Sequence, residues 1–195
     1  FIEKGTPGFS VGKIEDQMGM RGTPACELIF EDCPIPRKTL LGKEGDGFRI
    51  AMQTFDRSRP YDAALAVGIS HGAIEYAIEY AKQRVQFGRP IAEFQGIQFM
   101  LADMATLTEA ARQLVYKAAI LVDQGTPDSK FSAMANYFAT DVGVKVTNDA
   151  MQVLGGYGYM RDYPLEQKMR DARLLQIVEG TNQVLRIVVA RGLLR

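Results

Sequence analysis

The sequence predicts a mainly α protein, an up-and-down antiparallel helical bundle preceded by a short β remnant. Residues 1–41 are rich in glycine and proline and their apolar residues alternate, which is typical of strands. From residue 42 onward apolar residues recur every three or four positions, which is typical of helices. We therefore divide the chain into the tail of a truncated β domain, 1–41, and a helical bundle domain, 42–195.

The β remnant is too small to fold alone. Cys26, Leu28 and Phe30 face one way along a strand, and the residues between them face the other. Two or three short strands within about 40 residues cannot bury their own edges. The chain also opens at Phe1 rather than at a methionine, so we expect it to be a piece of a longer protein.

The first helix is predicted from Phe48 to about Gln86. Pro60 lies inside it and predicts a kink or break near Ser58–Arg59, because proline has no backbone N–H to donate. The residues expected to face the core form one stripe along this helix: Ala66, Ile69, Ala73, Ala77 and Ala81.

Two more long helices and two short ones are expected. The second long helix carries a seam with spacings of three and four: Phe94, Ile97, Leu101, Met104, Thr108, Ala111, Val115, Ala118 and Val122. The third is expected to open with Thr126 as N-cap and Pro127 at its first position, and to stop at Gly155-Gly156. Short helices follow at about 164–175 and 182–194. Long helices joined by short connections must lie antiparallel.

Composition excludes several classes of function. The 23 basic and 23 acidic residues give zero formal charge, so the bulk charge does not attract nucleic acid or an anionic membrane. One histidine and two cysteines are too few for a zinc site, and we expect no metal. No apolar run reaches the ~18–20 residues of a membrane span. We interpret both cysteines as reduced and expect a cytoplasmic protein, or a mitochondrial matrix protein if the source is eukaryotic.

Local patterns that could bind a ligand each have a plainer interpretation. Residues 56–60 place two guanidiniums and a hydroxyl beside the proline, which suits a phosphate, but the pattern alone favours a solvated charge cluster. Residues 84–90 place an aromatic ring between two arginines, which suits an anion with a flat ring, but arginine at a helix C-terminus is also ordinary. The glycine clusters at 42–47 and 155–158 match no nucleotide-binding fingerprint and are interpreted as turns.

Glu179 is chemically the most suggestive residue. It directly follows the apolar pair Ile177 and Val178, and it precedes a glycine and a threonine that can cap the last helix. A carboxylate in such a setting can act as a base. An acid that simply favours a helix N-terminus is about equally compatible with the pattern.

Six blocks of sequence, read together, resemble the acyl-CoA dehydrogenase family in order and spacing. The blocks are TFDRSRP at 54–60, RVQFGRPI at 84–91, FQ at 94–95, QVLGGYG at 152–158, MRDA at 169–172 and IVEGTNQ at 177–183. The resemblance covers the whole chain. It implies the last strands of the family's middle β domain followed by its entire C-terminal helical bundle.

The resemblance implies a flavoprotein oxidoreductase of fatty acid β-oxidation. Members carry out FAD-dependent α,β-dehydrogenation of an acyl-CoA thioester, and an electron-transfer flavoprotein usually reoxidises the flavin. By position Glu179 matches the general base, which removes the α-proton while a hydride leaves the β-carbon. Members assemble as homodimers or homotetramers. Because the missing part of the enzyme holds most of the flavin and acyl pockets, we expect the fragment alone to be inactive.

The resemblance also implies the binding residues. Those matching the substrate site are Asp56, Arg57, Ser58, Arg59 and Gly180. Those matching FAD contacts, partly made to a neighbouring subunit, are Arg84, Gln86, Phe87, Phe94, Gln95, Gln152, Leu154, Gly155, Gly156, Thr181 and Gln183. Val178 and Asn182 replace residues common in the family, tyrosine and serine, which leaves the acyl preference open.

Two other interpretations remain open. The chain could belong to a non-catalytic oligomerisation or scaffold protein that retains the bundle. The observation that suggests this interpretation is the long apolar seam from Phe94 to Val122. It could also belong to an acyl-CoA oxidase relative that passes electrons to oxygen.

Overall fold

The computed structural model describes residues 1–194. Contacts divide the chain into two compact units, Phe1–Thr54 and Phe55–Arg195, and each is described by itself below. Helices dominate, and the mainly α bundle with a short β segment is confirmed. The predicted domain boundary at 41/42 stays a prediction. The division between the two units falls between Thr54 and Phe55, inside the first long helix, α1 (Gly47–Gln83).

The first unit is built on a two-stranded antiparallel sheet. Strand β1 (Phe9–Ile14) pairs with β2 (Cys26–Phe30), with Phe9 opposite Phe30 and an irregularity between Val11 and Ile14. The rings of Phe9 and Phe30 stack with their centroids 5.2 Å apart. A short 3-10 helix, η1 (Arg37–Thr39), follows before α1 begins. Leu28 is still 54% exposed, so within this unit the hairpin is left largely uncovered.

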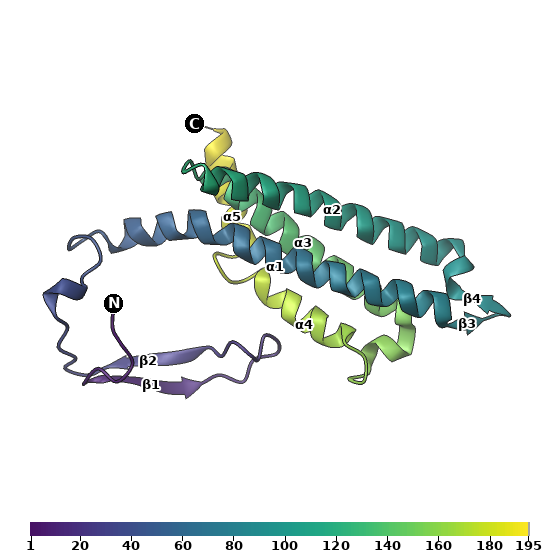
Figure 1. Ribbon diagram of the computed structural model, residues 1–195, viewed down its shortest axis with the longest axis horizontal. Helices are drawn as coiled ribbons and strands as arrows, with labels where there is room; N and C mark the ends of the chain where they lie inside the picture. Colours follow the sequence, from purple (N-terminus) through teal and green to yellow (C-terminus); the bar gives the residue numbers. More distant parts are fainter. Residues whose placement is uncertain (195) are drawn as a thin grey trace. The chain divides into compact units, whose positions relative to one another are not determined.

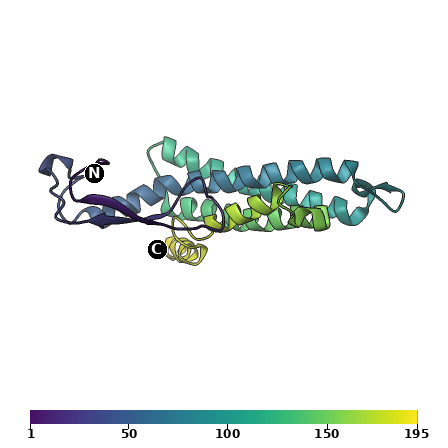
Figure 2. The same cartoon turned by 90° about the horizontal axis from the view of Figure 1, so that it is seen from below.

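The second unit is the helical bundle. Its helices are α1 after Phe55, α2 (Gln95–Asp123), α3 (Ser129–Leu154), α4 (Leu165–Leu175) and α5 (Asn182–Leu193). Helices α1, α2 and α3 run up and down side by side, with α4 alongside them (Figure 1). Helix α5 crosses the others near one end and is seen almost end-on in Figure 2. The connections are the β3–β4 hairpin (Val85–Gln86 and Arg89–Pro90) and the 3-10 turns η2 (Ile91–Glu93) and η3 (Gly155–Tyr159).

The core of the bundle is lined by small residues. The predicted stripe of α1 is buried at Ala66, Ala73, Ala77 and Ala81 and partly buried at Ile69. The predicted seam of α2 is buried from Met104 to Ala118. Alanine at these positions lets helix backbones approach closely, so a larger side chain there would have to push them apart.

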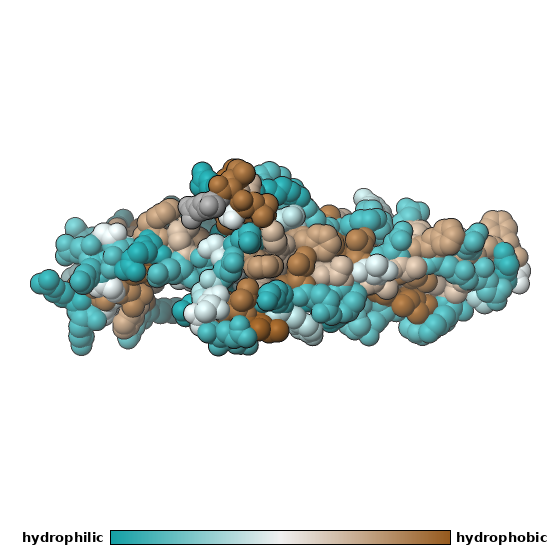
Figure 3. Space-filling model, turned by 90° about the horizontal axis from the view of Figure 1, so that it is seen from above, coloured by the Kyte–Doolittle hydropathy of each residue, from teal (hydrophilic) through white to brown (hydrophobic). Residues whose placement is uncertain are grey.

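Some apolar side chains remain on the surface of the bundle. On α2, Phe99, Tyr116 and Ile120 are 59%, 54% and 49% exposed. Figure 3 shows apolar residues interspersed among hydrophilic ones on one face of the helices. The chain by itself therefore leaves part of its apolar surface in solvent.

The predicted break at Pro60 does not occur. Helix α1 is continuous from Gly47 to Gln83, and Pro60 is buried inside it. Proline leaves the carbonyl of Asp56, four residues earlier, without its helical donor. The hydroxyl of Ser132 on α3 donates to this carbonyl at 2.6 Å. A tertiary contact thus replaces the missing backbone hydrogen bond, and the helix runs on.

The predicted start of the third helix is wrong by two residues. Its N-cap is Asp128, whose carboxylate accepts from the N–H groups of Lys130 at 2.8 Å and Phe131 at 3.1 Å. Thr126 instead closes the end of α2, where its N–H donates to the carbonyl of Leu121 at 2.9 Å. The predicted stop is confirmed, because α3 ends at Leu154 and Gly155 follows with a positive φ of 60°.

No helix in the described part of the chain is both long and apolar enough to cross a membrane. Among residues 1–194, no group of three or more histidine, cysteine, aspartate or glutamate side chains is arranged to hold a metal ion. Cys26 and Cys33 are free thiols.

Candidate functional site

Glu179 lies in the turn between α4 and α5, and its backbone conformation is unusual. Its φ is +56°, and that of Gly180 is +96°. Glycine adopts this left-handed region freely, but for a residue with a side chain it costs about 1–3 kcal/mol. Such a conformation persists only where neighbouring contacts enforce it.

Two residues of α1 hold Glu179 directly. The hydroxyl of Ser58 donates to Oε2 of Glu179 at 2.6 Å, and Nε of Arg59 donates to its backbone carbonyl at 3.2 Å. Arg59 is only 5% exposed and pairs with Asp56 at 3.4 Å. Burial lowers the pKa of Arg59, while the charges of Asp56 and Glu179 act in the opposite direction. Since arginine ionises far above neutral pH, it remains a cation.

The charged cluster at 56–59 is therefore divided by the fold. Asp56 forms an ion pair with Arg59, and its carboxylate also accepts a hydrogen bond from the hydroxyl of Ser129 at 2.5 Å. Ser58 and Arg59 face the Glu179 turn, whereas Arg57 is exposed. The interpretation as a solvated cluster holds only for Arg57.

Asp62 is a further acid near this turn that sequence reasoning missed. Its Oδ2 atom is buried and has no hydrogen-bond partner among the described residues. Burial and the nearby charge of Glu179 raise the pKa of Asp62 to about 6. The available signal was its spacing, because positions four apart on a helix share one face and Asp62 follows Ser58 by four.

A separate cavity of about 900 Å³ lies where α1 meets the β3–β4 hairpin. Its lining includes eight residues predicted to bind a cofactor: Arg84, Gln86, Phe87, Phe94, Gln152, Leu154, Gly155 and Gly156. Tyr80, Tyr157, Met100 and Met160 also line it and were not predicted. The cavity brings together parts of α1, the hairpin, α2 and the end of α3.

Aromatic and cationic groups surround the cavity. The guanidinium of Arg84 lies 5.5 Å from the centre of the Tyr157 ring, and that of Arg89 lies 4.3 Å from the centre of the Phe94 ring. Phe87, at the tip of the hairpin, meets Phe94 edge-on with centroids 6.1 Å apart and is 93% exposed. A cation beside flat rings and open space suits an anionic ligand that carries a ring system.

Three predicted cofactor residues do not line this cavity. Gln95 is the first, exposed residue of α2. Thr181 caps α5 by accepting from the N–H of Val184 at 3.4 Å, and Gln183, two residues later, is exposed. Their roles stay predictions.

Comparisons with known proteins identify the family. The family profile described as "Acyl-CoA dehydrogenase, C-terminal domain" matches residues 45–194. The chain belongs to the acyl-CoA dehydrogenase family. It is 54% identical to an acyl-CoA dehydrogenase of Bacillus subtilis over 193 residues, which are 99% of this chain and 51% of the relative. The chain thus spans about half the length of the curated relatives that it matches.

Solved structures show the same family likeness. The chain superposes on butyryl-CoA dehydrogenase from Megasphaera elsdenii with a TM-score of 0.98 at 50% identity, covering 100% of this chain and 51% of that one. It also matches a chain in a structure of the electron transferring flavoprotein of Acidaminococcus fermentans, with a TM-score of 0.98 at 58% identity and covering 100% and 51%. The family resemblance of the six sequence blocks is therefore confirmed.

Proposed function

We propose that this chain is the C-terminal part of an FAD-dependent acyl-CoA dehydrogenase in which Glu179 removes the α-proton of the acyl-CoA thioester. The observation that carries the proposal is the Glu179 carboxylate held by Ser58 in a strained turn. A base must be fixed within hydrogen-bond reach of the proton that it takes. The family membership supplies the reaction class.

The residues around Glu179 can support proton removal at a carbon next to a thioester. The Ser58 hydroxyl holds the carboxylate in one orientation, and Arg59 holds the backbone. The N–H of Glu179 itself makes no hydrogen bond to the described residues, so it is free to donate to the thioester oxygen. A donor aimed at the oxygen where negative charge develops stabilises the enolate.

Gly180 keeps the turn compact next to this donor. A Cβ there would lie 3.5 Å from Leu185 and 3.7 Å from the Arg59 guanidinium, so space alone would admit it. The φ of +96° would not. We assign Gly180 to the passage of the substrate, together with Asp56, Arg57, Ser58 and Arg59.

The cavity beside the hairpin fits part of FAD. When bound, FAD supplies the acceptor for the hydride that leaves the β-carbon. The guanidinium of Arg84 can bind a phosphate, and the rings of Phe87 and Tyr157 can stack on a flat ring system. Gly155 and Gly156 line the cavity without side chains that would fill it. These residues fit an anionic cofactor with an aromatic end.

The separation of the two sites supports a homodimer or homotetramer. Ser58 and the end of α1 at Gln83 are about 38 Å apart along the helix, at 1.5 Å per residue. The cavity and Glu179 of the same chain therefore lie near opposite ends of the part of α1 that belongs to the bundle. We therefore propose that the cavity of one copy helps to hold the FAD that works beside Glu179 of another copy.

The electron acceptor is proposed to be an electron-transfer flavoprotein. Support comes from the likeness to a chain in the Acidaminococcus fermentans flavoprotein structure. Rapid oxygen consumption by the full-length enzyme without any other acceptor would favour an oxidase instead.

The decisive experiment replaces the base in the full-length enzyme. Glu179→Gln keeps the shape of the side chain and removes the carboxylate, and we expect bleaching of bound flavin by acyl-CoA to slow by about 10²–10⁴-fold. Glu75→Gln on exposed α1 surface is the matched control. Undiminished bleaching in the Glu179 variant would refute the assigned base, and a colourless protein that cannot take up FAD would favour a scaffold.

A further inference from the structure

The turn that carries Glu179 is fastened at both ends to one carboxylate on α3. Gln176, before the turn, donates from Nε2 to Oδ1 of Asp141 at 2.7 Å. Asn182, after the turn, donates from Nδ2 to the same oxygen at 2.7 Å. The N–H of Asn182 also donates to the carbonyl of Gln176 at 3.1 Å. Asp141 thus joins the two ends of the turn from Gln176 to Asn182, and Glu179 is the middle residue of that turn.

The second oxygen of Asp141 is also engaged. Nη2 of Arg186 on α5 donates to Oδ2 at 2.6 Å, and the guanidinium lies 4.8 Å from the centre of the Tyr137 ring. We call Asp141, Gln176, Asn182 and Arg186 the Asp141 network. Because all three donors converge on one carboxylate, none can move without changing the others.

Asn182 is the buried member of the network. It is 2% exposed, and its amide also meets the Thr140 hydroxyl, which donates to its Oδ1 at 3.1 Å. A buried amide with its partners in place has one orientation. Asn182 is also the first residue of α5, so the network sets where the helix starts and where the turn must end.

These contacts stabilise the unfavourable backbone conformation of the turn. Two successive residues with positive φ, Glu179 and Gly180, are held against the cost of that conformation. Ser58 and Arg59 fix the middle of the turn from α1, and the Asp141 network fixes its ends from α3 and α5. The carboxylate of Glu179 is therefore placed by three helices at once.

We propose that Asp141 is a positioning residue for catalysis, which fixes the Glu179 turn through Gln176 and Asn182 without touching the substrate. The proposal rests on the proposed function of Glu179. An error of about 1 Å in the placement of a reacting group can cost about 10²-fold in rate. Loss of the network should accordingly lower kcat, while the affinity for acyl-CoA and the content of FAD should change little.

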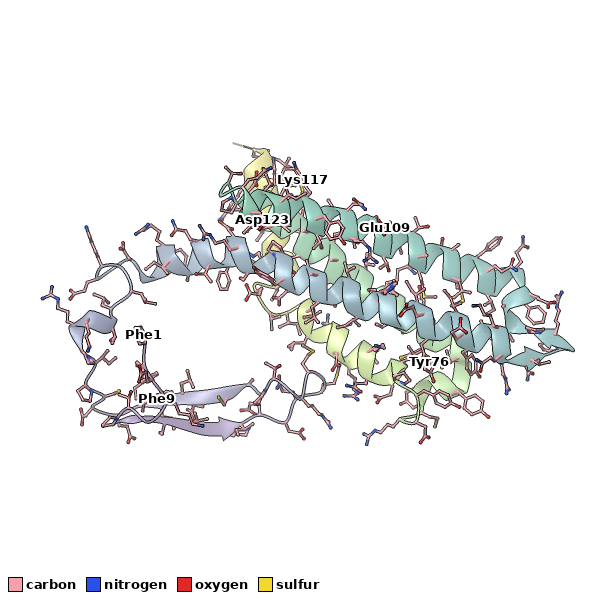
Figure 4. The ribbon with its side chains drawn as sticks, viewed as in Figure 1. Phe1, Phe9, Tyr76, Glu109, Lys117 and Asp123 are labelled. Atoms are coloured by element: carbon pink, nitrogen blue, oxygen red, sulfur yellow. The ribbon has the colours of Figure 1, made fainter. Side chains whose placement is uncertain are left out.

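The test is Asp141→Asn in the full-length holoenzyme. The amide keeps the shape but offers one acceptor oxygen, and it turns an N–H₂ group toward donors. We expect kcat to fall by about 10–100-fold with KM changed by less than about threefold. Glu109→Gln is the matched control, because Glu109, labelled on α2 in Figure 4, also accepts from a glutamine at 2.6 Å and an arginine at 3.0 Å. It should leave kcat unchanged.

A double variant separates this proposal from the one on which it rests. If Asp141 acts through Glu179, adding Asp141→Asn to Glu179→Gln should lower kcat by less than about twofold more. A full multiplication of the two effects would overturn the positioning role and leave the base intact. No effect of Glu179→Gln alone would instead refute the base.

A second, milder variant tests the proposal if Asp141→Asn does not fold. Gln176→Leu removes one of the three donors and leaves Asn182 and Arg186 in place. We expect kcat to fall by about 3–10-fold with bound FAD unchanged. An unchanged kcat in Gln176→Leu would overturn the proposal.

Discussion

The two ends of α1 within the bundle differ in how far contacts within the chain bury and hydrogen-bond their side chains. At the Ser58 end, side-chain hydrogen bonds join α1 to the Glu179 turn, α1 to α3 and α3 to α5, and Arg59 is 5% exposed. At the Arg84 end, side chains border an open cavity, and Phe87 is 93% exposed. The first end is organised by contacts within the chain, whereas the second leaves open space beside its side chains.

The difference is what the proposed tasks of the two ends would require. A base needs fixed geometry, which packing and hydrogen bonds within the chain can supply. A large cofactor needs open space until it binds. The four predictions below test this contrast, each in the full-length protein, from the largest expected effect on stability to the smallest.

Arg59→Met should be the most destabilising change. It removes a buried cation and leaves Oδ1 of Asp56 and the carbonyl of Glu179 without the donor that Arg59 supplies. Ser129 still donates to Oδ2 of Asp56. Breaking a buried pair from one side costs about 3–5 kcal/mol. The shift of the urea unfolding midpoint measures this, and a change below about 1 kcal/mol would show that the Glu179 end is not held as we describe.

Ser132→Ala tests the hydroxyl that compensates for Pro60. The carbonyl of Asp56 would lose its donor at 2.6 Å, and a buried acceptor left unpaired costs about 1–3 kcal/mol. In a Pro60→Ala background the restored N–H of residue 60 can bond the same carbonyl. The cost of Ser132→Ala should then fall below about 1 kcal/mol, and equal costs in both backgrounds would contradict the explanation.

Asp62→Asn should change how stability depends on pH. The pKa of Asp62 is raised to about 6 in the folded chain, so between about pH 4 and pH 6 the unfolded state ionises first. The contribution of Asp62 to the free energy of unfolding therefore falls as pH rises through that window and is constant above it. Removing the acid should remove this loss and stabilise the protein by about 1–2 kcal/mol at pH 7.

The control for this slope is Asp123→Asn, at the end of α2 (Figure 4). It should leave the difference between pH 4 and pH 7 unchanged. If the parent protein and Asp62→Asn showed the same difference, Asp62 would not be the acid responsible.

Arg84→Met should have the smallest effect on folding and a clear effect on the cofactor. The guanidinium lies 5.5 Å from the centre of the Tyr157 ring and forms no side-chain hydrogen bond or ion pair with the described residues, so the free energy of unfolding should change by less than about 0.5 kcal/mol. Retention of FAD should weaken by about tenfold or more, the equivalent of one charge-assisted hydrogen bond. Dialysis followed by flavin absorbance measures it. Tight retention by the variant would remove Arg84 from the cofactor site.

Much of the candidate site could be predicted from the sequence, because its blocks are local. The eight residues around the cavity were named from short motifs, and the structure brings them together. The positions of Gln95, Thr181 and Gln183 relative to a cofactor were not resolved in this way. Asp62 and Asp141 were missed, since neither belongs to a motif and each matters only through a distant partner.

The sequence alone determined most of the helices, because spacing of three and four fixes which residues share a face, and because Gly155 ends α3 and Thr181 caps α5 through contacts with neighbouring residues. Only the tertiary structure decided that α1 continues through Pro60, and which members of the charged cluster meet Glu179. Ser58 and Glu179 are 121 residues apart in the chain. A contact of that kind depends on how helices dock, and docking depends on every side chain in the core at once.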